Sequence, residues 1–259
     1  MIQTVRSFVS LVSFISCSIS PYELNGWLHH YDNIGINNTI SKVYLHDHTC
    51  RKTHTISLNR YGIPHGYIST FTSTNKRKLI NAHIKTLDIN SYLIYADSDE
   101  YFIISDNDWK NVVNGYAIHA KLIPLVRPKR KLSCNTLNYL DKFVYACDVH
   151  TMNMKKIILT PVHYNGNYIQ YKSSHDLSTH IPRRNATYNS HHLRFTCSTP
   201  YITQSKINSY KTAEKTYANI QALNRYLYEM QWFTQMGNVW ILTDTFLKTA
   251  TCHKHNSYV

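Results

Sequence analysis

Three carboxylates stand close together in the sequence, immediately after a short apolar run. The run covers residues 92–96, and the acids that follow it are Asp97, Asp99 and Glu100. A short run rich in aromatic and branched side chains is typical of a buried strand, so the acids are expected at a strand end. Carboxylates at this spacing repel one another and raise one another's pKa. A divalent cation would relieve the repulsion, and oxygen ligands favour Mg²⁺ or Mn²⁺.

An alternative interpretation is an acidic turn that simply leaves a strand and binds nothing. Matches as short as Asp-x-Asp also arise by chance. The long apolar approach, and the aromatic pair Tyr101 and Phe102 behind the acids, favour the metal site.

Length and composition leave several function classes open. The chain has 259 residues, enough for one large domain or two small ones with a sizeable core. Its apolar content of 43% argues against wholesale disorder. The formal net charge of +13 favours an anionic partner: nucleic acid, an acidic membrane or a phosphorylated small substrate.

Neither the cysteines nor the N-terminal segment changes this picture. The six cysteines are widely spaced and include no CxxC pair, which argues against a zinc ribbon. Residues 8–17 are apolar but too short to span a bilayer, and no other stretch predicts a transmembrane segment. We interpret them as a first buried strand, with a cytoplasmic location slightly favoured. If residues 1–20 are instead a signal peptide, the protein is secretory.

The first hundred residues alternate between strand and helix patterns. Strands are predicted at 8–17, 40–45 and 92–96, and helices at 22–33 and 76–87. Residues 49–73 are interpreted as a loop with strand-like pieces around Ile56 and Tyr67. This alternation predicts an α/β fold with a mostly parallel sheet flanked by helices. Ligands bind beyond the carboxyl ends of such strands, where Asp47 and Asp97 would lie.

The second half has weaker patterns. A short helix is predicted at 106–113, strands at 117–126, 143–146 and 157–162, a long helix at 205–231, and a helix or strand at 239–247. Residues 127–131 form a basic run, which is more often a solvated face than a nucleic-acid site.

Four short motifs in the first half match a known pattern. They are Trp27-Leu28-His29-His30-Tyr31, Ile34-Gly35-Ile36, Val43-Tyr44-Leu45-His46-Asp47 and Asp97-Ser98-Asp99-Glu100-Tyr101-Phe102. In order and spacing the chain resembles glycosyltransferases of the family 92 and family 2-like group, over residues 7–104. The resemblance implies a single GT-A-like (Rossmann-like) domain. Residues 1–104 would be its nucleotide-sugar-binding half and residues 105–259 its acceptor-side half.

Beyond residue 104 the resemblance rests on shorter segments. They are Lys155-Lys156-Ile157-Ile158 with Pro161, Leu193-Arg194-Phe195 and Ser205-Lys206. The chain departs from the family pattern at Cys17-Ser18, where the family has Asn-Glu, and at Cys197-Ser198, where it has His-Tyr. These departures concern the donor contact and part of the acceptor site.

The resemblance implies transfer of a sugar from a nucleotide diphosphate sugar, a UDP-sugar first, to a glycan or other hydroxyl acceptor. Asp99, helped by Asp97, would hold Mn²⁺ or Mg²⁺ against the two phosphates. His175, or as second choice His180, would be a further metal ligand.

Further roles follow for the donor and the acceptor. Asp47 would contact the nucleoside, and Lys155 and Arg194 would screen phosphate. An inverting reaction also needs a general base, for which Asp106, Asp108 and Asp176 are candidates.

Three other functions fit the sequence less well. A phosphatase of the Asp-x-Asp-x-Thr type needs Thr where Tyr101 stands. A two-metal nuclease needs more acids than this chain offers nearby. A basic nucleic-acid-binding protein would explain the net charge but not the acids at a strand end, so no nucleic-acid partner is expected.

Overall fold

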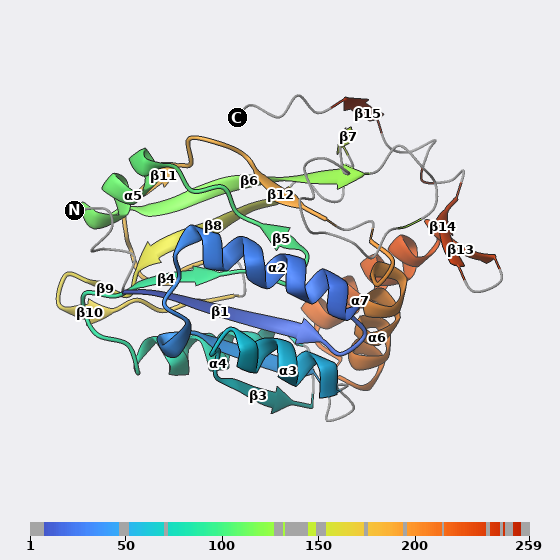
Figure 1. Ribbon diagram of the computed structural model, residues 1–259, viewed down its shortest axis with the longest axis horizontal. Helices are drawn as coiled ribbons and strands as arrows, with labels where there is room; N and C mark the ends of the chain where they lie inside the picture. Colours follow the sequence, from blue (N-terminus) through green and yellow to red (C-terminus); the bar gives the residue numbers. More distant parts are fainter. Residues whose placement is uncertain are drawn as a thin grey trace.

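The computed structural model in Figure 1 describes residues 8–46, 52–69, 72–126, 132, 145–148, 154–173, 176–193, 196–213, 215–236, 239–243, 246 and 251–254. Its helices are α2 (Pro21–Ile34), the short 3₁₀ helix η1 (Asn38–Ile40), α3 (Lys52–Arg60), α4 (Ser73–Ile84), α5 (Asp106–Val113), α6 (Thr199–Thr212) and α7 (Tyr217–Met230). Its strands are β1 (Val9–Ser16), β2 (Lys42–His46), β3 (His65–Ile68), β4 (Tyr92–Tyr95), β5 (Glu100–Tyr101), β6 (Ala117–Val126), β7 (Tyr145–Asp148), β8 (Met154–Pro161), β9 (His163–Tyr164), β10 (Asn167–Tyr168), β11 (Arg183–Asn185), β12 (Ser190–His192), β13 (Phe233–Met236), β14 (Val239–Leu242) and β15 (Thr251–Lys254).

One sheet of eleven described strands runs through the molecule (Figure 1). Its main path has the order β15-β7-β6-β8-β4-β1-β2-β3. The strands β3, β2, β1 and β4 are parallel, whereas β8 joins β4 antiparallel and continues antiparallel to β6. Every antiparallel pair in this sheet includes a strand of the second half. The predicted α/β fold, a mostly parallel sheet flanked by helices in a single domain, is confirmed.

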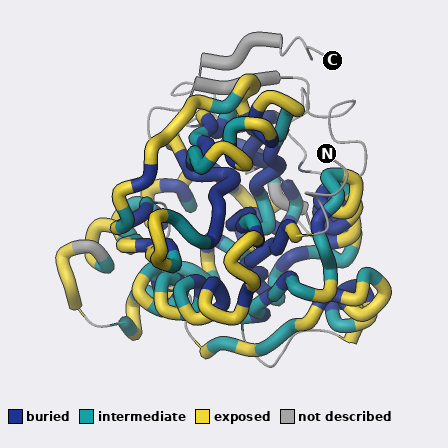
Figure 2. Tube along the Cα trace, turned by 90° about the vertical axis from the view of Figure 1, so that its left-hand side faces the viewer, coloured by how far each residue is buried: buried dark blue, intermediate teal, exposed yellow. Residues whose placement is uncertain are grey.

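Strand β1 is buried along its whole length, including its three serines. Leu11 belongs to a core cluster with Trp27 of α2, whereas Val12 and Phe14 belong to a second cluster with Ile80 of α4. Because successive side chains of a strand point to opposite faces, α2 and α4 cover opposite faces of the sheet. Figure 2 shows this buried interior beneath exposed helices and loops. The interpretation of residues 8–17 as a buried strand is confirmed.

Helix α2 has clear local start and stop signals. Ser20 and Glu23 form a capping box, and Pro21 occupies the first turn. The helix ends at Gly35, whose φ of 87° is a left-handed conformation that glycine adopts without strain. The predicted helix at 22–33 is therefore confirmed.

Two sequence predictions about elements are wrong. Residues around Ile56 were expected to be strand-like but belong to helix α3, where Ile56 is exposed and Leu58 is buried. The buried residues His54, Ser57 and Leu58 follow the helical period. The apolar residues Ile56 and Leu58, taken alone, have the alternate spacing of a strand. The predicted helix at 205–231 is two helices, because the chain is extended at Ala213 and α7 begins with its own cap at Thr216.

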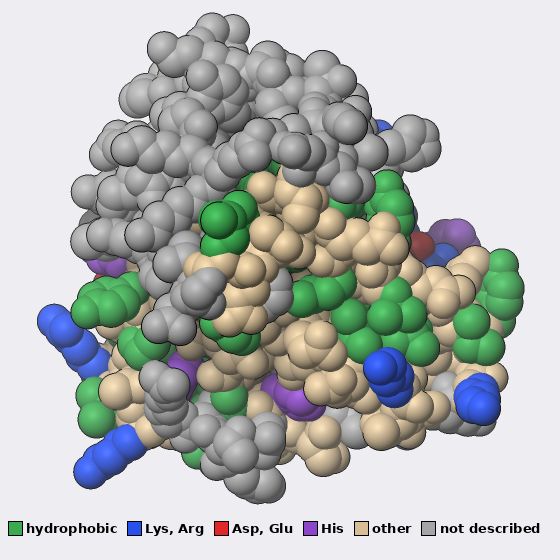
Figure 3. Space-filling view, turned by 90° about the vertical axis from the view of Figure 1, so that its right-hand side faces the viewer, with side chains coloured by type: hydrophobic (Ala, Val, Ile, Leu, Met, Phe, Trp, Pro, Cys, Tyr) green, Lys and Arg blue, Asp and Glu red, His purple; other side chains and the backbone are tan. Residues whose placement is uncertain are grey.

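Helices α6 and α7 leave apolar side chains at the surface. Tyr201, Tyr217, Ile220 and Leu227 are exposed, and Figure 3, which views the molecule from the side where α6 and α7 lie in Figure 1, shows apolar groups between polar ones. Among the helices that the structure describes, none has both the length and the apolar character needed to cross a bilayer.

Candidate functional site

The acidic turn, Asp97 to Glu100, lies at the carboxyl edge of the parallel strands. Strand β4 is apolar and buried, and the turn connects it directly to β5, whose first residue is Glu100. Strand β1 runs parallel beside β4, so the carboxyl end of β1 lies at the same edge. The sequence prediction that these acids stand at a strand end is confirmed.

Two lysines from distant segments neutralise part of the acidic turn. Lys76 Nζ of α4 donates to Asp97 Oδ1 at 2.6 Å, and Lys156 Nζ of β8 lies 3.8 Å from Asp97 Oδ2. Burial alone would raise the pKa of Asp97, but the ammonium groups of Lys76, Lys156 and Lys206 hold it well below its usual range. The expected repulsion between the carboxylates is therefore relieved within the protein itself.

Lys156 also neutralises Glu100. Its ammonium lies 2.5 Å from Glu100 Oε2, and both side chains are almost completely buried. The same Nζ lies 3.9 Å from the ring centroid of Tyr95, a favourable position for a cation over an aromatic face. Glu100 Oε2 also accepts the backbone N–H of Asp97 at 2.8 Å. Burial raises the pKa of Glu100, and Lys156 opposes that shift.

Helix α2 holds the backbone of the acidic turn. The indole Nε1 of Trp27 donates to the carbonyl oxygens of Asp97 and Glu100, each at 3.1 Å. The Tyr31 hydroxyl donates to the carbonyl of Glu100 at 3.1 Å. Because Trp27 and Tyr31 are fully buried, these bonds fix the turn against a rigid helix face.

Asp99 is the acid of the turn that faces a cavity. Its side chain is 21% exposed, and its Oδ2 lies 3.1 Å from Nε2 of His192 on β12. The other ring nitrogen of His192, Nδ1, is buried and has no hydrogen-bond partner among the described residues. Asp99 lines a small cavity of about 20 Å³ together with Glu23 and Lys206, which is room for about one water molecule.

A larger cavity of about 500 Å³ lies at the carboxyl end of β1. It is lined by residues 17–21, which follow β1, and by Cys197, Ser198 and Tyr201 at the start of α6. Cys17 and Cys197 are both disulfide-bonded. The two cavities share Ile19, so the larger one lies beside the cavity that Asp99 lines.

Ser198 and Glu23 connect the two segments that line the larger cavity. The Ser198 hydroxyl donates to the carboxylate of Glu23, and the backbone N–H of Ser20 donates to Ser198 Oγ at 2.7 Å. Glu23 therefore caps α2 and also holds the start of α6. Burial raises the pKa of Glu23, and its hydrogen bond from Ser198 is the largest opposing effect.

The described residues offer a partial set of metal ligands. No group of three or more His, Cys, Asp or Glu side chains within the described part of the chain is placed to hold a metal ion. Asp97 is already engaged by two ammonium groups. Asp99 and His192 together supply one carboxylate and one imidazole. This pair fits Mn²⁺ or Mg²⁺ only as part of a shell that water and substrate phosphates complete.

Comparison with known proteins gave weak structural similarities. No protein-family model matches the chain, and no curated protein matches it. The S. aureus protein TarS has a TM-score of 0.37 and 11% identity, over 85% of this chain and 42% of that chain. A 1–349 TarS structure in complex with UDP-GlcNAc has a TM-score of 0.34 and 10% identity, over 85% of this chain and 71% of that chain. 4-Diphosphocytidyl-2C-methyl-D-erythritol synthase from Anaerococcus prevotii has a TM-score of 0.30 and 12% identity, over 85% and 84% of the two chains.

The predicted general-base candidates lie away from the acidic turn. Asp108 caps α5 by accepting from Ser105 at 2.9 Å and from the N–H of Thr187 at 3.0 Å, and Asp106 is exposed in the same first turn. Asp176 pairs with Arg183 at 2.8 Å. Arg183, the partner of Asp176, aligns with Ala117 at the start of β6. His192, the partner of Asp99, aligns with Pro124, seven residues further along β6. The structure therefore does not bring these aspartates to Asp99.

The two adjacent lysines of β8 lie in different environments. Lys155 was the candidate for phosphate but is exposed, whereas Lys156 is buried against the acids. Neighbouring residues of a strand face opposite sides, so the two lysines could not share one environment. His180 is exposed in a loop. The candidates Asp47, His175 and Arg194 lie outside the described residues.

The sequence analysis did not identify several residues that lie at the site. Lys76 was expected only as part of a helix, and His192 was one of 16 histidines. The available signal for Lys156 was its strand period, since one of two adjacent lysines in an apolar strand must face inward. No comparable local signal marks Lys76 or His192.

Proposed function

We propose that this protein is a glycosyltransferase that uses a nucleotide diphosphate sugar. The observation that carries the proposal is the position of Asp99, which lines a cavity at the carboxyl edge of the parallel strands beside Asp97 and Glu100. The turn lies where open α/β sheets bind ligands, beside the end of β1. The motif resemblance supports the same function from the sequence side.

In this proposal, Asp99 and His192 would hold a divalent cation, Mn²⁺ or Mg²⁺, and the diphosphate and water would supply its other ligands. When bound, the ion supplies Lewis-acid stabilisation of the charge that develops on the departing nucleoside diphosphate. Lys206, which lines the same cavity as Asp99, screens phosphate charge. Asp97 has a different task, which is to hold Lys76 and Lys156 in place.

The larger cavity at the end of β1 suits the donor. Its volume of about 500 Å³ is in the range of small-molecule sites, and it adjoins the cavity of Asp99. The donor site then includes residues of both halves of the chain, because residues 17–21 and Cys197, Ser198 and Tyr201 line this cavity together. The acceptor is a glycan or another hydroxyl compound. UDP-sugars are the first donors to examine.

The decisive experiment measures thermal stabilisation by UDP with and without Mn²⁺. We expect UDP with Mn²⁺ to raise the melting temperature of the wild type, because a ligand that binds only the folded state stabilises it. Asp99→Asn should abolish this effect. Asp32→Asn, an exposed aspartate on α2, is the matched control and should respond like the wild type.

Two results would contradict the proposal. One is full stabilisation of Asp99→Asn by UDP with Mn²⁺, which would separate the acid from the nucleotide. The other is stabilisation of the wild type by an oligonucleotide and not by UDP, which would favour the nucleic-acid-binding alternative. A screen for donor hydrolysis across nucleotide sugars then identifies the sugar.

A further inference from the structure

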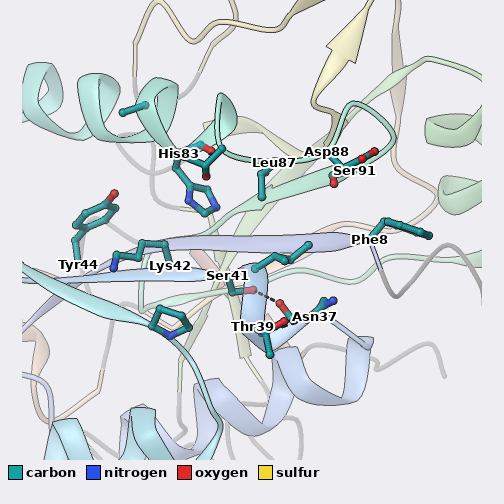
Figure 4. Close-up of a pocket in the computed structure, with 14 residues that line it drawn as sticks. Phe8, Asn37, Thr39, Ser41, Lys42, Tyr44, His83, Leu87, Asp88 and Ser91 are labelled. Carbon is teal, nitrogen blue, oxygen red and sulfur yellow. Dashed lines mark hydrogen bonds between the residues drawn. The ribbon is translucent and has the colours of Figure 1, made fainter.

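A groove of about 650 Å³ lies at the opposite edge of the sheet from the acidic turn (Figure 4). Its wall includes Phe8, Ser41 and Ser91, which immediately precede β1, β2 and β4. The last turn of α4 forms one side, and we call it the α4 groove. Because the acids follow β4 and the groove precedes it, the two sites are separate. Its volume is in the range of small-molecule pockets.

Lys42 carries an uncompensated positive charge into the α4 groove. Its Nζ donates to the carbonyl oxygen of His65 at 3.4 Å, and it forms no ion pair with any described residue. Asp88 also lines the groove, but its Oδ1 accepts the N–H of Asn90 at 2.8 Å, and Figure 4 shows it at the other end from Lys42. Among the described residues, none therefore brings a negative group to the part of the groove beside Lys42.

His83 adds no second charge. Burial lowers its pKa to about 4, and the nearby charge of Lys42 acts in the same direction. Its ring is therefore neutral near pH 7, and its Nε2 lies 2.8 Å from the Ser10 hydroxyl. Lys42 is the one lysine or arginine among the described residues that line the groove. A single cation matches a ligand with a single acidic group.

The remaining wall is suited to a flat apolar group. Tyr44 is held in place by stacking on Phe14, with ring centroids 5.2 Å apart and planes 15° apart. Leu87 and Phe8 continue this wall away from Lys42, as Figure 4 shows. Aromatic and aliphatic walls with one charged group are typical of sites for small organic anions.

We propose that the α4 groove binds a small aromatic molecule that carries one acidic group. The anion pairs with Lys42 Nζ, and the ring lies along Tyr44 and Leu87. A carboxylate, a phosphate ester and a sulfonate share the chemistry that Lys42 recognises. Because the groove is separate from the acidic turn, this binding does not depend on the proposed transferase function.

The test uses the full chain and two fluorescent probes that differ in charge. 8-Anilinonaphthalene-1-sulfonate is an aromatic anion, and N-phenyl-1-naphthylamine is its neutral analogue. We expect the wild type to bind the anion about tenfold more tightly than the neutral probe. Lys42→Met should remove that preference. Lys85→Met, an exposed lysine at the end of α4, is the matched control and should keep it.

A second variant tests the location without touching the charge. Ala82 lines the groove from the exposed side of α4, so Ala82→Trp should fill it and weaken binding of both probes. Cooperative urea unfolding shows that each variant is folded. The proposal is overturned if folded Lys42→Met keeps the anion preference, if Ala82→Trp binds both probes normally, or if UDP with Mn²⁺ displaces them.

Discussion

Lys156 is a buried ammonium that lies against two carboxylates of the acidic turn. Its side chain is 1% exposed and pairs with Glu100, which is 2% exposed. Removing one partner of a buried pair leaves the other charge uncompensated, which costs about 3–5 kcal/mol. We therefore expect Lys156→Met to lower the free energy of unfolding by about that amount, measured by urea denaturation.

Its neighbour provides the control for this prediction. Lys155→Met alters an exposed side chain of the same strand and should change the free energy of unfolding by less than about 0.5 kcal/mol. Equal effects of the two substitutions would mean that Lys156 does not compensate the acids.

Asp97 makes stability depend on pH. Its pKa in the folded protein is held well below the ordinary value of 3.8, so the unfolded chain takes up a proton first as pH falls. The stabilisation is therefore present above about pH 4 and is lost as pH falls through the folded pKa. We expect Asp97→Asn to be about 1.5–3 kcal/mol less stable than the wild type near pH 7. Urea denaturation of both proteins should show this difference shrinking below about pH 4, and a difference that grew on acidification would contradict it.

At the residue scale, the sequence predicted the position of the acids but not what neutralises them. The apolar approach to Asp97 is a local pattern, so the strand end could be recognised. Lys76 and Lys156 lie 21 and 56 positions from their partners Asp97 and Glu100, and the packing of α4 and the order of the sheet bring them there. The inference that a metal must relieve the repulsion omitted these lysines.

At the scale of elements, α2 positions the acidic turn by hydrogen bonds to its backbone. Trp27→Phe keeps an aromatic ring in the core but removes the donor to two carbonyl oxygens. Each carbonyl keeps another donor, the Tyr31 hydroxyl for Glu100 and the N–H of Glu100 for Asp97. We therefore expect the loss of one hydrogen bond, about 0.5–1.5 kcal/mol in urea denaturation. Tyr22→Phe on the exposed side of the same helix should have little effect. An unaltered stability of Trp27→Phe would show that the turn does not need α2.

Elements with their own start and stop signals were predicted well. Helix α2 has a capping box and a glycine stop, and β1 and β4 are short, mostly apolar segments. Helix α3 was missed because its buried face includes polar residues such as His54 and Ser57, which hydropathy does not mark as core. The break between α6 and α7 was missed because Thr216 is a cap signal inside a continuous helical pattern.

At the scale of the whole molecule, the net charge is +13. We therefore expect weak attraction to nucleic acid, whatever the function of the protein. In Figure 3, lysine and arginine side chains stand out on a face where acidic groups are barely visible. Such attraction is sequence-independent and depends steeply on salt. We expect binding of a short oligonucleotide to weaken at least about tenfold between about 50 and 200 mM salt, measured by fluorescence anisotropy.

The same change of salt concentration distinguishes a nucleotide-sugar site from a nucleic-acid site. Stabilisation by UDP with Mn²⁺ should persist, because a coordinated diphosphate in a partly enclosed cavity is screened far less than a surface charge. Oligonucleotide binding that survived high salt and recognised one sequence would instead favour a dedicated nucleic-acid site.

The sheet order also determines when, during synthesis, the residues that contact the acidic turn become available. The ribosome releases the segment with Asp97 and Glu100 long before Lys156 and His192, and chains begin to fold from the N-terminus as they emerge. A nascent chain that ends before β8 therefore has the parallel strands β1 to β4 and Lys76 beside Asp97, but it lacks Lys156, the partner of Glu100. The first half of this protein is consequently expected to stay open to proteases or chaperones until translation has passed β12.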